Sequence, residues 1–135
     1  MKEIKIATAQ FQTRNGDKEF NLSRIRSLTA EAAGMGAQVV SFHELSITSY
    51  SFLRDLSHSE IVDLSEEVPS GESTSELIRI AGECGVALLA GLVEREGSRI
   101  YNTYVCVTGR IRCQVQETAS IYQQAPFPGR PVRGI

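Results

Sequence analysis

Eight residues near the middle of the chain, 86–93, are almost continuously apolar. Gly85 precedes this run, and Gly97 and Ser98 follow it with the residue types of a hairpin turn. Such a run is typical of a β-strand that is covered on both faces. A strand of this kind has to lie inside a sheet with other layers packed around it, which favours an α/β fold.

Helical and strand patterns alternate around this run. Apolar residues from Leu22 to Met35 recur at spacings of three and four, which predicts a helix with Asp17 as its N-cap and Gly36 near its end. Ser57 and Ser73 are each followed by Glu three residues later, the spacing of a capping box at the start of two further helices. Strands are expected at residues 2–11, 38–45, 86–93 and 100–108. We therefore predict a mixed sheet with helices covering one face.

Composition removes several classes of function. The formal net charge is −2 over 135 residues, without a basic cluster, which excludes nucleic acid and anionic membrane as expected partners. The N-terminus lacks the apolar core of a signal peptide, and no apolar run is long enough to span a bilayer. Three cysteines in spacings that fit no zinc site are expected to be reduced thiols of a cytoplasmic protein. No metal or cofactor is expected.

The strongest candidate for chemistry is Glu44. It ends the apolar strand Gln38–Leu45, and ligand-binding and catalytic groups of open α/β sheets gather beyond the C-terminal ends of strands. A carboxylate leaving such a strand is expected to be partly desolvated, which suits a general base. From the residues alone, a solvated glutamate that merely begins a loop is the more ordinary interpretation.

Other motifs lead to structural interpretations. His43-Glu44 starts like a zinc metalloprotease helix, but Ile47 stands where the second histidine belongs. Gly34-Met35-Gly36 follows a helix, whereas a dinucleotide-binding loop follows a strand. Cys84 and Cys106 are expected to be packing residues.

Several segments together resemble the carbon–nitrogen hydrolases of the nitrilase superfamily. They occur in the family's order along nearly the whole chain to about Gly109, and one departure is His43, where the family usually has proline. The matching segments are Ile6–Phe11 as the opening strand, Asp17, Asn21 and Ile25 in the first helix, Gly36–Leu45 as the strand that delivers the catalytic glutamate, Tyr50 and Phe52 in an aromatic loop, and Gly85–Gly91 followed by Tyr101-Asn102-Thr103.

The resemblance implies a four-layer αββα sandwich, of which residues 1–110 are the N-terminal half. It implies a Glu–Lys–Cys triad that hydrolyses a small amide, nitrile or carbamoyl compound, with Glu44 as the general base. A half-length domain leaves one sheet face uncovered, so we expect a homo-oligomer or a marginally stable fold.

The rest of the triad has no counterpart here. Lys2, Lys5 and Lys18 all precede Glu44, and the family's lysine segment corresponds in position to 114–118, where no lysine occurs. The family's cysteine lies further along the fold. We therefore expect the chain by itself to be inactive, and a fragment that acts only through association is the alternative to an enzyme.

Residues 111–135 form an atypical tail. Three of the four prolines lie in it, and we expect the part from Gln114 onward to be poorly structured. Codons for residues 115–119 can be chosen so that a shifted reading frame encodes Tyr-Arg-Lys-Gln-His, which resembles the family's lysine segment. We predict that the coding sequence near codons 111–114 carries a frameshift. A coding sequence with no lysine segment in either alternative frame would contradict this hypothesis.

Overall fold

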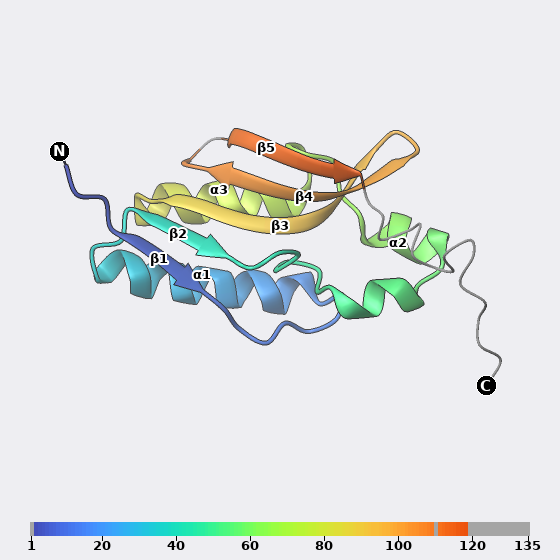
Figure 1. Ribbon diagram of the computed structural model, residues 1–135, viewed down its shortest axis with the longest axis horizontal. Coiled ribbons are helices and arrows are strands. Elements are labelled where there is room, and N and C mark those ends of the chain that lie inside the picture. The colour runs from blue at the N-terminus through green and yellow to red at the C-terminus, as the bar shows by residue number, and fades with distance from the viewer. Residues whose placement is uncertain (1, 110, 119–135) are drawn as a thin grey trace.

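The computed structural model describes residues 2–109 and 111–118, which form five strands, three α-helices and one 3₁₀ helix (Figure 1). In chain order these are β1 (Ile6–Ala9), α1 (Lys18–Gly34), β2 (Val39–Phe42), the 3₁₀ helix η1 (Ser51–Asp55), α2 (His58–Leu64), α3 (Glu72–Cys84), β3 (Ala87–Glu96), β4 (Arg99–Val107) and β5 (Ile111–Thr118).

The five strands form one mixed sheet in the order β1-β2-β3-β4-β5. The first two pairs are parallel, since helices carry the chain back between β1, β2 and β3. The last two pairs are antiparallel, and Gly97 and Ser98 form the turn of the first hairpin. Gly97 has a φ of 59°, and tight two-residue hairpin turns need a residue with positive φ, which glycine adopts without strain. The mixed α/β sheet agrees with the expectation from the sequence.

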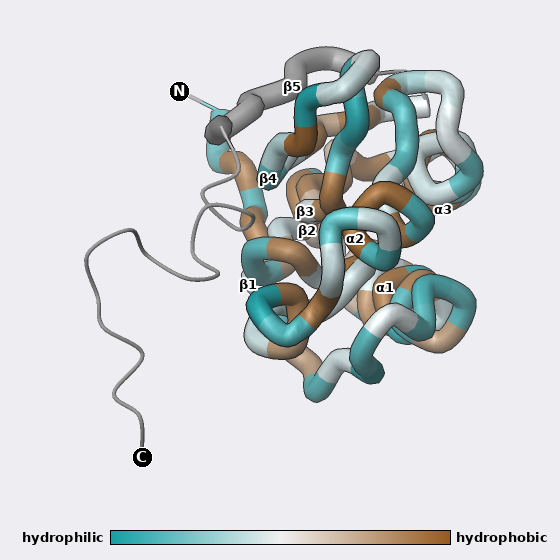
Figure 2. Tube along the Cα trace, turned by 90° about the vertical axis from the view of Figure 1, so that its right-hand side faces the viewer, coloured by the Kyte–Doolittle hydropathy of each residue, from teal (hydrophilic) through white to brown (hydrophobic). Residues whose placement is uncertain are grey.

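Helices α1 and α3 lie side by side on one face of the sheet (Figures 1 and 2). The main core fills the space between the two helices and the sheet. Both layers contribute fully buried side chains to it, such as Ile25, Val40, Leu77, Leu88 and Val105. Each such aliphatic side chain contributes about 1.5–3 kcal/mol of burial energy. A smaller cluster of Leu45, Leu53, Ile61, Val93 and Ile100 packs η1 and α2 against the end of the sheet near the β3–β4 hairpin.

The opposite face of the sheet is open over β1 and β2 (Figure 2). Alternate residues of the strands point to it, and we call this set the open face. Ile6 is 65% exposed and Thr8 is exposed, while the other members are half-buried. The open face consists of Ile6, Thr8, Val39, Ser41, Leu89, Tyr104 and Cys106. Within the described residues, no helix is long and apolar enough to cross a membrane.

Two of the expected helix N-caps are confirmed. The Asp17 side chain accepts a hydrogen bond from the backbone N–H of Phe20. Ser57 and Glu60 form the complete capping box of α2. Gly85 ends α3 with a φ of 67°, the left-handed conformation that glycine adopts without strain.

The capping box expected at Ser73 is wrong. Gly71 is the N-cap of α3, and the Ser73 backbone N–H instead donates to Glu66 Oε1 over 2.8 Å. The Ser73 hydroxyl also donates to the second carboxylate oxygen, Glu66 Oε2, and Lys18 Nζ lies 2.9 Å from that same oxygen. A carboxylate at a helix N-terminus accepts hydrogen bonds from N–H groups that have no partner within the helix. Its negative charge also interacts favourably with the positive end of the helix dipole. Glu66 therefore does from a preceding segment what Ser73 was expected to do.

The expectation of a poorly structured stretch from Gln114 is wrong for the residues up to Thr118. β5 (Ile111–Thr118) pairs along β4, with a register irregularity at Cys106 and Val107. The backbone N–H and C=O groups of β4 on that side need partners, and an adjacent strand supplies them. The rest of the expected tail, 119–135, lies outside the described residues.

Glu66 ties three segments together, and its titration should be visible in the stability of the chain. Its side chain is 12% exposed. Burial raises the pKa of Glu66, but the hydrogen bonds from Ser73 and the contact with Lys18 outweigh it, so the pKa lies below its ordinary 4.5. A lowered pKa means that the ionised group stabilises the fold above the unfolded-state pKa, and that this stabilisation is lost as pH falls through the folded-state pKa.

We therefore predict that Glu66→Gln lowers the free energy of unfolding at pH 7 by about 1–3 kcal/mol, the range for a hydrogen bond to a charged group. The deficit should shrink as pH falls below 4.5. Urea unfolding of both proteins between pH 7 and pH 3.5 measures it. Glu67→Gln, at the exposed neighbouring position, is the matched control and should have little effect. A deficit that stays constant across this pH range would contradict the role given to the Glu66 charge.

Candidate functional site

Glu44 lies two residues beyond the end of β2, at the start of the turn 44–48. The residues that follow it, Leu45 to Ser49, are all buried, whereas Glu44 itself is exposed. The expectation of a partly desolvated carboxylate is therefore wrong for this chain. The sheet end on which Glu44 stands has no layer of described residues above it, so the carboxylate reaches solvent.

The backbone of Glu44 and Leu45 crosses directly over Gly91 of β3. A Cβ atom on Gly91 would lie 2.5 Å from the Leu45 nitrogen and 3.4 Å from the Glu44 carbonyl carbon. The Ile47 N–H donates to the Gly91 carbonyl over 3.0 Å, and the Gly91 N–H donates to the Ser46 hydroxyl over 3.3 Å. The missing side chain of Gly91 is what admits this crossing. Leu45 has a φ of 49°, a left-handed backbone conformation that residues other than glycine rarely adopt.

A buried asparagine holds the far end of this turn. The Asn21 amide group, on α1, donates to the Ile47 carbonyl and to the Arg14 carbonyl, each over 2.9 Å. Its oxygen accepts from the Arg14 N–H, and the residue is fully buried. Asn21 thus connects α1, the loop after β1 and the turn that carries Glu44. The sequence placed Asn21 on the first helix but contained no spacing signal for this long-range role.

Two side chains of β4 reach across β3 to the end of β2. Asn102 donates a hydrogen bond from its amide nitrogen to Glu44 Oε1. The Tyr104 hydroxyl donates to the Phe42 carbonyl, and the Ser41 hydroxyl lies 2.9 Å from the Tyr104 hydroxyl oxygen. A phenol has one proton, so Ser41 is the donor of the second bond. β4 therefore contacts both the Glu44 carboxylate and the backbone just before it.

His43 packs beside the glutamate rather than pointing into a metal site. Its ring lies 5.3 Å from the ring of Phe11, and its Nδ1 is 3.2 Å from the Glu44 carbonyl oxygen. Phe11 also contacts Phe42 edge-on, at 6.1 Å between ring centres. Among the described residues, no group of three or more acidic, histidine or cysteine side chains could hold a metal ion.

Lys18, Cys84 and Cys106 do not contact the Glu44 carboxylate. Lys18 is paired with Glu66, and Cys84 is the last residue of α3, in the helix layer. Cys106 lies on the open face, four residues along β4 from Asn102, which separates their Cα atoms by about 14 Å at ~3.4 Å per residue. The site in this part of the chain is thus a held carboxylate without a nucleophile beside it.

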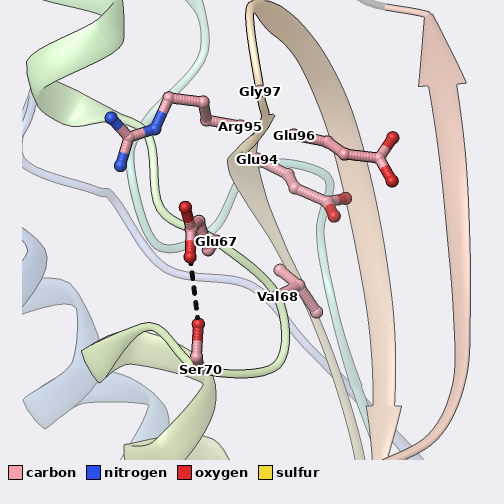
Figure 3. Close-up of a pocket in the computed structure, with 7 residues that line it drawn as sticks. All are labelled: Glu67, Val68, Ser70, Glu94, Arg95, Glu96 and Gly97. Carbon is pink, nitrogen blue, oxygen red and sulfur yellow. Dashed lines mark hydrogen bonds between the residues drawn. The ribbon is translucent and has the colours of Figure 1, made fainter.

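A cavity of about 520 Å³ lies elsewhere, beside the β3–β4 hairpin (Figure 3). Its lining includes the carboxylates Glu67, Glu94 and Glu96 and the guanidinium of Arg95. Glu94 is buried and accepts a hydrogen bond from the Thr103 hydroxyl. Glu44 does not line this cavity, and no cysteine does, so it is separate from the candidate site.

Residues 5–124 match the sequence model of a family described as carbon–nitrogen hydrolase. A nitrilase from Pyrococcus abyssi is 33% identical over 107 residues, which cover 79% of this chain and 40% of that protein. The omega-amidase NIT2 of Danio rerio is 31% identical, over 89% of this chain and 48% of that protein. The chain therefore spans less than half the length of these relatives.

Solved structures show the same fold. An amidase from Nesterenkonia superposes with a TM-score of 0.63 at 25% identity, over 84% of this chain and 42% of that one. The protein XC1258 from Xanthomonas campestris, described as a member of the CN-hydrolase superfamily, superposes with a TM-score of 0.72 at 20% identity, over 87% of this chain and 41% of that one. The nitrilase-type α/β fold expected from the sequence is confirmed.

The crossing over Gly91 gives a direct test of how Glu44 is held. We predict that Gly91→Ala lowers the free energy of unfolding by about 3 kcal/mol or more, because the added methyl group meets backbone that can move only with the whole turn. Thermal or urea unfolding measures this change. Gly34→Ala, on α1 with no atom within 4 Å of the new Cβ, is the matched control. It should be neutral or stabilising by up to about 1 kcal/mol, because alanine favours the helix. Equal effects of the two substitutions would contradict the crossing.

Proposed function

Because this chain belongs to the carbon–nitrogen hydrolase family, we propose that Glu44 is the general base of a site that hydrolyses a small non-peptide amide, nitrile or carbamoyl compound. The observation that supports it most strongly is the held carboxylate. Glu44 stands at the C-terminal end of a parallel strand, is exposed to solvent and accepts a hydrogen bond from Asn102. A general base needs a fixed position and access to the reacting group.

The proposed chemistry uses a cysteine thiol as nucleophile. Glu44 takes the thiol proton as sulfur attacks the carbonyl carbon, and it returns that proton to nitrogen as the carbon–nitrogen bond breaks and ammonia leaves. A water molecule then attacks the thioester and gives a proton to Glu44. The carbon–sulfur bond breaks, the proton returns to sulfur, and the acid is released. A solved structure of the Nesterenkonia amidase, with acrylamide added at its active-site cysteine, supports thiol chemistry in a relative.

Two parts of this site must come from polypeptide other than the described residues. No lysine occurs after Lys18, and Lys18 forms an ion pair with Glu66. In the proposed mechanism a lysine stabilises the negative charge that develops on the substrate oxygen. Cys106 is too far along β4 to give its proton to a carboxylate bonded to Asn102. We therefore propose that residues 2–118 supply the base and its supports, and that the nucleophile and the lysine lie beyond them.

The alternative is an inactive fragment that acts only through association. The open face favours association, because its apolar side chains, Ile6 above all, remain in contact with water. We propose that copies of this chain associate through the open face when nothing else covers it. This alternative and the enzyme differ in whether Glu44 matters to turnover.

A hybrid protein tests the proposed function. It joins residues 1–110 of this chain to the part of the Pyrococcus abyssi nitrilase that this chain does not match. We predict that the 135-residue chain alone releases no ammonia from simple amides or nitriles, and that the hybrid does. In the hybrid, Glu44→Gln should lower kcat by about 10²-fold or more, the usual contribution of a general base.

Glu31→Gln is the matched control, because Glu31 is exposed on α1, in the helix layer. It should leave the rate unchanged. Turnover of the hybrid that survives Glu44→Gln would refute the role of Glu44. A folded hybrid without turnover, together with a chain that sediments as an oligomer, would favour the association alternative.

A further inference from the structure

The side chain of Asn102 has a position that its residue type does not favour. Asparagine is depleted in strands, yet Asn102 lies inside β4, between the β-formers Tyr101 and Thr103. It is half-buried, and its amide nitrogen donates to Glu44 Oε1. The contact joins residues 58 positions apart in the chain and spans β3, which lies between β2 and β4.

We propose that Asn102 is the positioning residue of Glu44 and selects which carboxylate oxygen acts as the base. This inference rests on the proposed function of Glu44. An exposed glutamate ordinarily samples several rotamers. The bond from Asn102 holds Oε1, so Oε2 is the oxygen left to take a proton from the nucleophile or from water.

An amide suits this task better than a titratable group would. Its N–H donates to a carboxylate, but it neither gives up nor takes a proton in the working pH range. The carboxylate is therefore fixed without a competing proton transfer. A carboxyl group at this position would repel Glu44, and an apolar side chain would leave it unrestrained.

Tyr104 supplies the second half of the same support. It stands two residues from Asn102 on the same face of β4 and is paired in register with Gly91. Its hydroxyl donates to the Phe42 carbonyl, two residues before Glu44. β4 thus fixes the backbone that leads to Glu44 through Tyr104, and the carboxylate through Asn102. Holding a reacting group at two points is the preorganisation that a general base requires.

NMR on the 135-residue chain tests this inference without any turnover. In the wild-type chain we expect the Glu44 side chain to occupy one dominant rotamer, and one Asn102 side-chain amide proton to be shifted downfield and protected from exchange with water. Asn102→Asp keeps the shape but removes the donor. It should lower the population of the dominant Glu44 rotamer by roughly twofold, as the side chain spreads over the staggered wells. Asn102→Leu, which adds no charge, should do the same.

Asn15→Asp is the matched control, since Asn15 accepts a hydrogen bond from Ser49 through an oxygen that aspartate retains. It should leave the Glu44 rotamer unchanged. Backbone amide spectra show whether each variant is folded, and Asn102→Leu serves if Asn102→Asp does not fold. A Glu44 side chain that stays equally ordered in a folded Asn102 variant would overturn the inference.

The two hypotheses fail in different measurements. An ordered Glu44 that depends on Asn102, in a chain whose hybrid shows no hydrolysis, would count against the proposed function and support the positioning role. Hydrolysis that depends on Glu44, combined with a rotamer that ignores Asn102, would sustain the function and refute the positioning role.

Discussion

The close passage of the Glu44–Leu45 backbone over Gly91 is the constraint on which the site depends. β2 and β4 are separated by β3, and Tyr104 of β4 reaches the Phe42 carbonyl at the end of β2 across a place where β3 presents no side chain. Gly91 is that place. Its backbone N–H and C=O also bind Ser46 and Ile47, so one residue both admits the crossing and fastens it. The backbone of the turn that carries Glu44 is thereby fixed by Gly91, and its carboxylate accepts a hydrogen bond from Asn102.

The supports of Glu44 are almost all uncharged. Asn21 holds the turn from below through three hydrogen bonds in a fully buried position, and Tyr104 and Asn102 hold the strand end and the carboxylate from β4. The amide groups of Asn21 and Asn102 keep their hydrogen-bonding character across a wide pH range because amides do not titrate. The ion pair of Lys18 with Glu66 lies instead beside the N-terminal ends of α1 and α3 and stabilises the fold there. The charge of the proposed base is therefore separated from the charges that hold the scaffold.

The same topology that presents Glu44 also leaves it incomplete. Helices α1 and α3 cover one face of the sheet (Figure 2), and the Glu44 carboxylate accepts a hydrogen bond from Asn102, which shares the other face with Tyr104. An uncovered sheet face with Ile6 at its margin calls for another layer, because exposed apolar area of this kind is costly in water. The relatives are more than twice as long as the part that this chain matches. We therefore propose that a layer which covers this face also completes the site.

Most helices and strands could be predicted from the sequence, and so could the candidate base. The period of the apolar residues located α1, the run at 86–93 located the central strand, and the resemblance to the carbon–nitrogen hydrolases indicated Glu44 as the expected base. These signals are local, since periodicity and capping depend on residues within a few positions of one another. Two local interpretations were nevertheless wrong. Ser73 does not cap α3, because the Glu66 carboxylate already occupies its N–H, and residues 111–118 form a strand because β4 offers an edge to pair with.

The contacts that hold Glu44 and the exposure of its side chain to solvent follow from the tertiary structure alone. The contacts to Asn102 and Gly91 join residues about 50 positions apart, and no spacing rule connects such pairs. The exposure of Glu44 depends on which face of the sheet is covered, and that is set by where α1 and α3 pack. The family resemblance of the sequence indicated Glu44 as the expected base, whereas its position and its supports follow from a crossing that exists only when β2, β3 and β4 lie next to one another.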